Sequence, residues 1–532
     1  MTAVIRIIPV DGTCKLNLSW STPQNITEWR NKPYRLLSFC LGHEGPGSLL
    51  ALLKVLRKRW HDCLPCSDAL FALQARGWAC DLTAGFAHSL RNFSIFVCNI
   101  TLTTEGMGHW RAIVYLVHRY LEIMKNAQPS ECAALFAESI LIEDASFKFQ
   151  EKQSGETIAQ SASTGMLEYP PEFCHCAQTC ILDKDFMFEE WQRWLQCLCD
   201  PGKNMRVHFI ATKESHEKDV GGELQWLSER WYKTEYQTEP LHTALSPQPS
   251  APITVSFAAL AALGAAVDAQ NELELPPSNP YLPANFNMLP LESACAPRPV
   301  LSAERAVSWA ATEVSLKEPR VSFCMHMQVP WADADVDSYI TNSIMIKIIE
   351  ETFSTAKYLA EEAKYEIRLT HQHSACVTSG LRVSVLGFSD KMDAVLHDVC
   401  STIAAPAISP ELLALVVDTM QQTMEELKVD DAYSHCLRPA DHVRRLPWFS
   451  EAAKEQALTR ITLEKLRDAH AKFMRECFAT IVLCGNLSMT AASSMSKSVL
   501  KALEIPITLV APDCATPAFT QTPHRALQAQ LT

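Results

Sequence analysis

The sequence predicts an α+β fold of two related units, each a sheet with helices packed on it, joined by a proline-rich linker. Three observations predict this class. Short apolar or alternating runs rich in β-branched residues alternate with longer helical repeats. Proline, serine and threonine become frequent between about residues 240 and 300. The same strand–helix order then returns, which is typical of two copies of one unit.

Each half supplies its elements in a similar order. In the first half we expect strands at 4–10, 15–21, 94–103 and 205–212. We expect helices at 48–59, 104–125 and 131–150. A short alanine-rich helix lies within the linker. In the second half we expect strands at 319–329, 380–388 and 478–485. We expect helices at 335–358 and from Lys391, Pro410 and Leu463. The predicted organisation is a unit at 1–240, a linker without a core of its own at 241–300, a unit at 301–512 and a tail at 513–532.

Composition excludes several classes of protein. The formal net charge is −13 and no long run of lysine or arginine is present, so a nucleic-acid partner is not expected. No apolar run reaches the length of about 18 residues that a membrane helix needs, and the first apolar run contains Arg6 and Pro9, which a signal peptide disfavours. The 20 cysteines are spread through apolar stretches, as buried free thiols are. We therefore expect a cytoplasmic protein that does not bind a membrane.

The stretch LGHEGPGSLL begins with His43-Glu44, as the zinc motif H-E-x-x-H does. That motif needs a second histidine one helical turn later, but here Gly47 stands in its place, after Pro46. The inverted motif H-x-x-E-H is absent at all 17 histidines. No zinc-protease motif is therefore present in the sequence.

A phosphate-binding loop is also disfavoured in this stretch. The loop needs a lysine after its last glycine, whereas Gly47 is followed by Ser48. Ser48 is expected to be a helix N-cap, because its hydroxyl can accept a hydrogen bond from an orphan amide.

Two groups of cysteines and one histidine pair are candidates for metal sites. Cys63 and Cys66 form a C-x-x-C without the second pair that structural zinc requires. A second group could gather on adjacent turns: Cys174, His175, Cys176, Cys180, Cys197 and Cys199. Buried helix thiols are the preferred interpretation, because the neighbours are apolar and no ligand spacing recurs. The pair His371 and His373 suits either one face of a strand or a loop, and neither receives a metal. No G-x-S-x-G or other nucleophile signature is present.

Several phrases stand in a characteristic order: GHEGPGSLL, RGWACDLTAG, FSIFVCNITLTTEG, FAESILIEDASFKFQEK, WYKTEY, LPPSNPYLPANFNMLPLE, YLAEEAKYEIRL, GLRVSVLGFSDK and VLCGNLS. Together they resemble the insulin-degrading-enzyme (insulysin) branch of the pitrilysin, or inverted-zincin, metallopeptidases. The resemblance covers nearly the whole chain up to about residue 512. It departs at an insertion over 60–75, at a longer stretch over 370–380 and at Lys364, where the family commonly has glycine.

The resemblance implies a place for this chain within a larger architecture. Family members carry four homologous α+β domains around a chamber, and their zinc motif lies in the first. The chain matches the second and third of these domains. It is therefore expected to carry no cofactor of its own, since the family's zinc would sit in the first domain.

The resemblance also implies a substrate-binding exosite in the first unit, where a substrate strand pairs with an exposed sheet edge. The matching positions are Gly42, Glu44, Leu82, Thr83, Ala84 and Gly85. Gly42 would allow close approach of a backbone, and Glu44 would pair with a substrate's terminal ammonium. Two substitutions depart from the family pattern: Ala84 replaces a glycine and Phe39 replaces a histidine.

Three functions remain open from the sequence. The first is a non-catalytic, peptide-binding part of an insulysin-like zinc metallopeptidase, with extended peptides as partners. The second is a structural subunit that pairs with a zinc-bearing catalytic relative, or with a second copy of itself. The third is a Cys/His metal protein.

Overall fold

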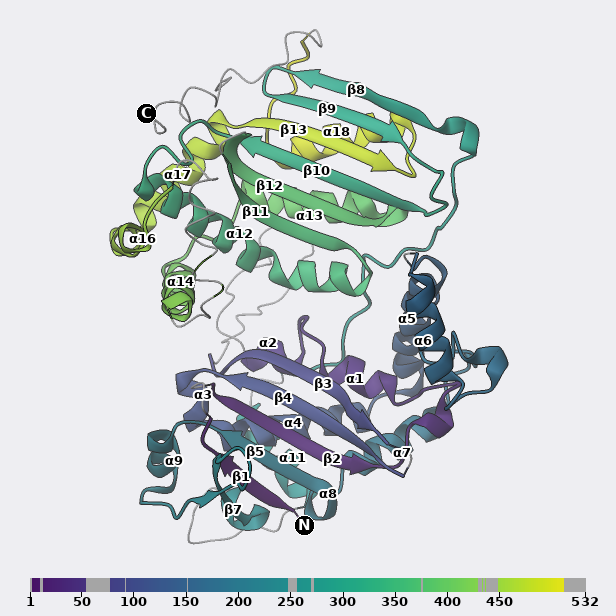
Figure 1. Cartoon of the computed structure of the whole chain (residues 1–532), viewed down its shortest axis with the longest axis vertical. Coiled ribbons are helices and arrows are strands. Elements are labelled where there is room, and N and C mark those ends of the chain that lie inside the picture. Colours follow the sequence, from purple (N-terminus) through teal and green to yellow (C-terminus); the bar gives the residue numbers. More distant parts are fainter. Residues whose placement is uncertain are drawn as a thin grey trace. The chain divides into compact units, whose positions relative to one another are not determined.

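The computed structural model contains two compact units, Met1–Asn279 (unit 1) and Pro280–Thr532 (unit 2), which are described separately. It describes residues 2–9, 13–53, 77–90, 92–150, 152–246, 256–268, 272–374, 377–428, 433, 436 and 448–510. The predicted insertion over 60–75, its Cys63–Cys66 pair and the tail over 513–532 lie outside the described residues. Figure 1 shows a sheet with helices against it in each unit.

Unit 1 is built on a seven-stranded sheet with the order β3-β4-β2-β5-β1-β7-β6. Its strands are β1 (Ala3–Ile7), β2 (Lys15–Thr22), β3 (Ala79–Ser89), β4 (Ser94–Leu102), β5 (Met205–Ile210), β6 (Leu227–Ser228) and β7 (Glu235–Pro240). Its α-helices are α1 (Arg35–Leu41), α2 (Leu49–Leu53), α3 (Thr104–Gly108), α4 (Trp110–Lys125), α5 (Pro129–Lys148), α6 (Gly155–Gly165), α7 (Phe188–Leu198), α8 (Pro201–Asn204), α9 (Lys213–Val220), α10 (Leu241–Ala244) and α11 (Phe257–Val267).

Strict alternation places the core of unit 1 on one face of its sheet. Along β4 every second residue, from Ser94 to Leu102, is buried, and the residues between them are half-buried. The buried face packs against helices α4 and α7, and α11 packs on α4. Trp110 of α4 stacks on Phe209 of β5 with ring centroids 5.2 Å apart. Among the described residues, no such helical layer covers the opposite face of the sheet in Figure 1.

Unit 2 is built on a six-stranded sheet with the order β11-β12-β10-β13-β9-β8. Its strands are β8 (Cys295–Ala303), β9 (Ala306–Thr312), β10 (Arg320–Gln328), β11 (Glu366–Ser374), β12 (Val377–Phe388) and β13 (Phe478–Gly485). Its α-helices include α12 (Val336–Glu362), α13 (Met392–Ala404), α14 (Pro410–Lys428), α16 (Glu451–Leu458), α17 (Leu463–Glu476) and α18 (Met489–Ala502). Helices α12, α13 and α18 lie against one face of this sheet (Figure 1).

The two sheets share one five-stranded core. In unit 1 it is β3-β4-β2-β5-β1 and in unit 2 it is β11-β12-β10-β13-β9. In both cores the first three pairs are antiparallel and the last pair, β5 with β1 or β13 with β9, is parallel. The strands also follow one another along the chain in the same order. The predicted α+β class with two related sheet units is thus confirmed.

The segment predicted to be a linker, 241–300, is divided between the two units. Helix α11 packs along α4, and Leu260 and Leu273 belong to the core of unit 1. After residue 279 the chain joins unit 2, where the Tyr281 hydroxyl donates a hydrogen bond to Asp398 at 2.6 Å. The expectation of a segment without a packed core is therefore wrong for α11. The small alanine side chains allow close packing against another helix, and this possibility was not considered in predicting a linker.

Gly264 lets α11 approach the backbone of α4 closely. A Cβ atom at this position would lie 2.1 Å from the Tyr115 carbonyl oxygen. We expect Gly264→Ala to lower the free energy of unfolding by about 1–3 kcal/mol, since overpacking outweighs the usual helix preference for alanine. The measurement is urea denaturation followed by tryptophan fluorescence. Gly155→Ala in α6 is the matched control, because nothing lies within 4 Å of its Cβ position; equal effects of both substitutions would contradict the packing account.

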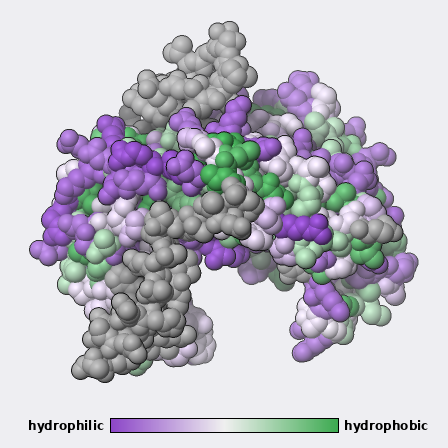
Figure 2. Space-filling view, turned by 90° about the horizontal axis from the view of Figure 1, so that it is seen from above, coloured by the Kyte–Doolittle hydropathy of each residue, from purple (hydrophilic) through white to green (hydrophobic). Residues whose placement is uncertain are grey.

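Hydrophilic and hydrophobic residues are interspersed over the face seen in Figure 2. Among the helices of the described residues, none is long and apolar enough to cross a membrane.

Candidate functional site

Strand β3 lies at one end of the sheet of unit 1. It pairs antiparallel with β4, in an unbroken register from Asp81 opposite Thr101 to Phe86 opposite Phe96. Among the described residues no other strand pairs with β3. In such a strand half of the backbone N–H and C=O groups point away from the only partner, where a further strand can bind.

The side chains of β3 point to the two faces of the sheet, so the outer edge presents main-chain groups. Leu82 is 2% exposed and lies in the core, and Ala84 and Phe86 pack against the same core. Thr83, on the opposite face, is exposed. Leu82 and Ala84 can therefore offer a ligand only backbone groups. The methyl group that distinguishes Ala84 from a glycine points toward the core.

Gly42 brings the end of helix α1 close to the backbone of β3. A Cβ atom on Gly42 would lie 3.6 Å from the nitrogen and 3.7 Å from the oxygen of Ala84. A Cβ atom on Gly85 would lie 3.7 Å from Oγ of Ser38, which is one turn before Gly42. The structure thus brings Gly42, Ala84 and Gly85 together. Glu44 follows two residues after Gly42 and is half-buried.

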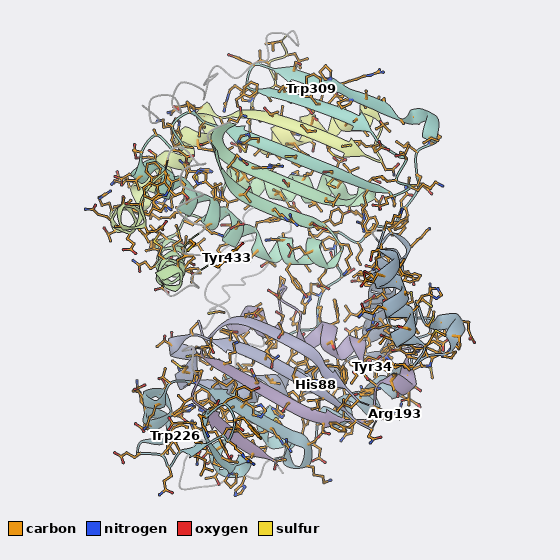
Figure 3. The ribbon with its side chains drawn as sticks, in the orientation of Figure 1. Tyr34, His88, Arg193, Trp226, Trp309 and Tyr433 are labelled. Carbon is orange, nitrogen blue, oxygen red and sulfur yellow. The ribbon has the colours of Figure 1, made fainter. Side chains whose placement is uncertain are left out.

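An aromatic cluster supports the far end of β3, and the sequence analysis did not identify it. The ring of Phe86 lies 5.2 Å from that of Tyr34, 5.8 Å from that of Trp194 and 5.2 Å from that of Phe96. Tyr34 is labelled in Figure 3, as is His88, two residues beyond Phe86. The apolar alternation Leu82, Ala84, Phe86 was the available signal. Such packing holds the strand in place before a ligand arrives, which reduces the entropy cost of binding.

The predicted role of Ser48 is confirmed. Its Oγ accepts a hydrogen bond from the backbone N–H of Ala51 at 3.1 Å, in the first turn of α2. His43 is only 1% exposed, and burial lowers its pKa to about 4. Its ring packs 5.6 Å from that of Phe39 and so close to Gly45 that a Cβ there would lie 2.5 Å from Nε2. His43 is therefore a neutral core residue that supports the loop between α1 and α2.

Acid should weaken the fold through buried histidines. Burial lowers the pKa of His43 and that of His118 to about 4, whereas the unfolded chain binds those protons near pH 6.5. The stability that they contribute is present above pH 6.5 and is lost as the pH falls toward 4, by about 1.4 kcal/mol per pH unit for each histidine. Between pH 6.5 and 5 we expect the free energy of unfolding of His43→Leu to fall less per pH unit than that of the unmodified chain. Denaturant titrations at several pH values measure it. The exposed His88→Leu is the control, and an unchanged slope in His43→Leu would contradict the account.

The cysteine cluster of unit 1 is held mainly through its backbone. The Lys32 ammonium donates to the carbonyl of Cys180 at 2.6 Å and to that of Gln178 at 3.1 Å, and burial lowers the pKa of Lys32 to about 7. Burial also raises the pKa of the Cys199 thiol to about 12. In the part of the chain that the structure describes, no three His, Cys, Asp or Glu side chains come together as a metal site.

The histidine pair of unit 2 lies in strand β11. His371 Nε2 lies 3.0 Å from Oδ1 of Asp333, and its Nδ1 lies 3.0 Å from Oγ of Ser343. Ser343 also donates to the Tyr339 carbonyl at 2.8 Å within its helix. The serine hydroxyl is thus engaged by its own helix, which gives His371 a structural role between β11 and α12.

A comparison with protein families shows which family model the chain matches. Residues 147–471 match the model described as the middle or third domain of peptidase M16. This match covers more than half of the chain.

Comparison with curated proteins gives relatives over almost all of the chain. It is 23% identical to the insulin-degrading enzyme of Homo sapiens over 505 residues, which are 93% of this chain and 44% of that protein. It is 23% identical to the insulin-degrading enzyme-like 2 of Arabidopsis thaliana over 94% of this chain and 46% of that protein. It is 22% identical to the nardilysin of Homo sapiens over 94% of this chain and 39% of that protein. The chain therefore spans less than half the length of these relatives.

Among solved structures, the crystal structure of pitrilysin matches with a TM-score of 0.67 and 16% identity. The match covers 96% of this chain and 49% of that chain. At this identity it shows a shared fold and nothing further.

Proposed function

Because this chain belongs to the peptidase M16 family, in its insulysin-type group, we propose that it binds extended peptides along β3 and does not hydrolyse them by itself. The partner is the backbone of a peptide of varied sequence. Binding adds that peptide as a further strand at the edge of the sheet of unit 1.

The single observation that supports this proposal is the edge of β3 from Asp81 to Phe86. Its regular pairing with β4 leaves an ordered row of backbone groups on the other side. Gly42 and Gly85 carry no side chain beside this backbone, so a second strand meets little obstruction. Each new backbone hydrogen bond contributes about 0.5–1.5 kcal/mol, so four or five of them supply about 2–7.5 kcal/mol, which corresponds at its middle to an affinity of about 1 mM.

Glu44 gives this site its preference for one end of a peptide. Glu44 is half-buried and lies two residues after Gly42, in the segment between α1 and α2. A free N-terminal ammonium placed there forms a charge-assisted hydrogen bond, which is roughly twice as strong as a neutral one. The proposed site is therefore Gly42, Glu44, Leu82, Thr83, Ala84 and Gly85, with Leu82 contributing its main chain.

Hydrolysis of a bound peptide would need a zinc ion, the water that it activates and a carboxylate base. We propose that these come from a zinc-bearing partner chain rather than from the residues of this sequence. Free thiols throughout the described residues support a reducing compartment such as the cytoplasm.

Fluorescence anisotropy with a labelled extended peptide tests the proposal. Gly42→Leu places a side chain beside the Ala84 backbone, and we expect it to weaken binding at least about tenfold. Its Cβ also lies 2.9 Å from the Ser38 carbonyl oxygen, so urea denaturation of the variant must show that it folds. Gly155→Leu, at an open position in α6, is the control and should leave the affinity unchanged. Glu44→Gln should weaken binding of a peptide with a free amino terminus about threefold to tenfold. The same substitution should not affect an N-acetylated peptide.

Equal affinities of the unmodified chain, Gly42→Leu and Gly155→Leu would remove the proposed site from β3. A structural subunit would instead show no peptide binding and would co-purify with a zinc-bearing relative.

A further inference from the structure

The two sheets end in four edge strands among the described residues: β3 and β6 in unit 1, and β11 and β8 in unit 2. Proteins usually protect such edges, because unpaired backbone groups recruit other chains. Strand β6 is protected by its length of two residues.

Strand β8 is protected in three ways. It contains Pro297 and Pro299, which have no N–H to offer, and its register with β9 shifts twice. At its end the chain pairs with residues 508–510, where the Glu304 N–H donates to the Thr508 carbonyl at 2.9 Å. Strand β8 is therefore closed to a further strand.

Strand β11 has none of these protections over seven residues. It pairs antiparallel with β12 in unbroken register from Glu366 opposite Leu386 to Gln372 opposite Gly380. This stretch contains no proline, and β12 is the only strand that pairs with it in the described part of unit 2. At about 3.4 Å per residue it offers an edge more than 20 Å long.

Strand β11 occupies the same position in its sheet as β3 does in unit 1. Each is the third strand of its core along the chain and lies at the end of the sheet, antiparallel to the next strand. Each also directs alternate apolar side chains into its core: Ile367 and Leu369 are 2% and 4% exposed, as Leu82 is in β3. Unit 2 thus contains a second strand of the same geometry.

The exposed face of β11 differs from that of β3 in its charge. Glu366 and Arg368 form an ion pair of 3.3 Å in which both side chains are more than half exposed. Thr370 is opposite Arg382 of β12, and Arg382 is also exposed. The two arginines outweigh the single glutamate, so this part of the edge favours an acidic neighbour.

We propose that β11 is a second strand-addition site, which binds an extended peptide with an acidic side chain opposite Arg368. The site rests on the proposed function in that it gives unit 2 the same mode of peptide binding as unit 1. It differs from the β3 site in recognising a side-chain charge rather than an amino terminus.

Hydrogen–deuterium exchange of the full chain tests the proposal. The probes are N-acetylated ten-residue peptides that alternate threonine and valine, with Glu, Gln or Lys at one central position. We expect the Glu peptide to slow exchange in residues 366–372. Arg368→Glu should weaken binding of the Glu peptide about fivefold to tenfold and strengthen binding of the Lys peptide by the same factor. Arg298→Glu, which changes an exposed arginine on the protected strand β8, is the control and should change neither affinity. Arg368→Gln should give an intermediate result.

The same exchange experiment reports on the β3 site through residues 81–86 and on the β11 site through residues 366–372. Protection at 81–86 without protection at 366–372 would overturn the second site and leave the proposed function intact. Protection at neither segment, with these peptides and with one that has a free amino terminus, would overturn both. Protection at 366–372 that grows with protein concentration in the absence of peptide would identify a second copy of the chain as the occupant and overturn the proposal.

Discussion

The purified chain is expected to leave a fluorogenic extended peptide intact, whether or not zinc is added. A zinc endopeptidase needs two histidines one turn apart on a helix, a third ligand and a carboxylate base. The 17 histidines of the sequence include no H-x-x-E-H and no H-E-x-x-H. Turnover should therefore fall below that of a zinc endopeptidase by a factor on the order of 10⁶ or more, and a chelator should not change the residual signal.

Contaminating peptidase activity is the main confounder of that measurement. Each preparation should therefore be assayed beside a matched one of the Gly42→Leu variant, with and without chelator. Chelator-sensitive turnover that is lost in Gly42→Leu would show a catalytic site belonging to this chain, and it would contradict the proposed division between binding and hydrolysis.

Arg6→Met is expected to cost about 2–3 kcal/mol of unfolding free energy, because it removes a buried guanidinium from two half-buried carboxylates, of which Asp219 keeps its pair with Arg111. Arg6 is fully buried in β1, where its Nη2 lies 2.8 Å from Asp219 and its Nε lies 2.7 Å from Glu239. Burial alone would raise the pKa of Asp219, but hydrogen bonds and charges from Arg111 and Arg6 outweigh it and lower that pKa. The stability from Asp219 is thus present above its unfolded pKa and is lost as the pH falls through the folded one.

Denaturation in urea at neutral pH measures this effect. Arg30→Met is the control, since the Arg30–Asp183 pair is about half exposed on both sides and should contribute less than about 1 kcal/mol. If the two substitutions had similar small effects, the buried cluster would not hold β1 to α9 and β7.

Strong local patterns explain how much of the fold the sequence could predict. Strand β4 alternates without interruption, and α4 repeats its apolar residues at helical spacing, so both are expected from the sequence. Strands β8 and β9 were not predicted, because β8 carries two prolines and β9 consists largely of small residues. The burial of Arg6 could not be predicted either, since its partners Asp219 and Glu239 are more than 200 positions away along the chain.

The candidate site was predictable in part. The glycines and the order of the matching segments pointed to Gly42 and to the strand that contains Ala84. Only the fold shows that a Cβ atom on Gly42 would lie 3.6 Å from the Ala84 nitrogen. The aromatic support from Tyr34 and Trp194 depends on tertiary packing that no local spacing reports. Lys364 shows the opposite case: it stands where the resemblance leads one to expect glycine, and it does adopt a left-handed φ of 65°, two residues before β11.

A backbone N-methyl scan of a bound peptide tests the account most directly. The probe is an extended eight-residue peptide with a free amino terminus and no acidic residue, methylated at one backbone nitrogen at a time. A strand added to β3 pairs through every second residue, so alternate methyl groups should weaken binding about tenfold or more. The intervening ones should leave the anisotropy titration unchanged, and the alternation should disappear in Gly42→Leu. A profile without a two-residue period, or one that Gly42→Leu leaves intact, would contradict peptide binding at the β3 edge.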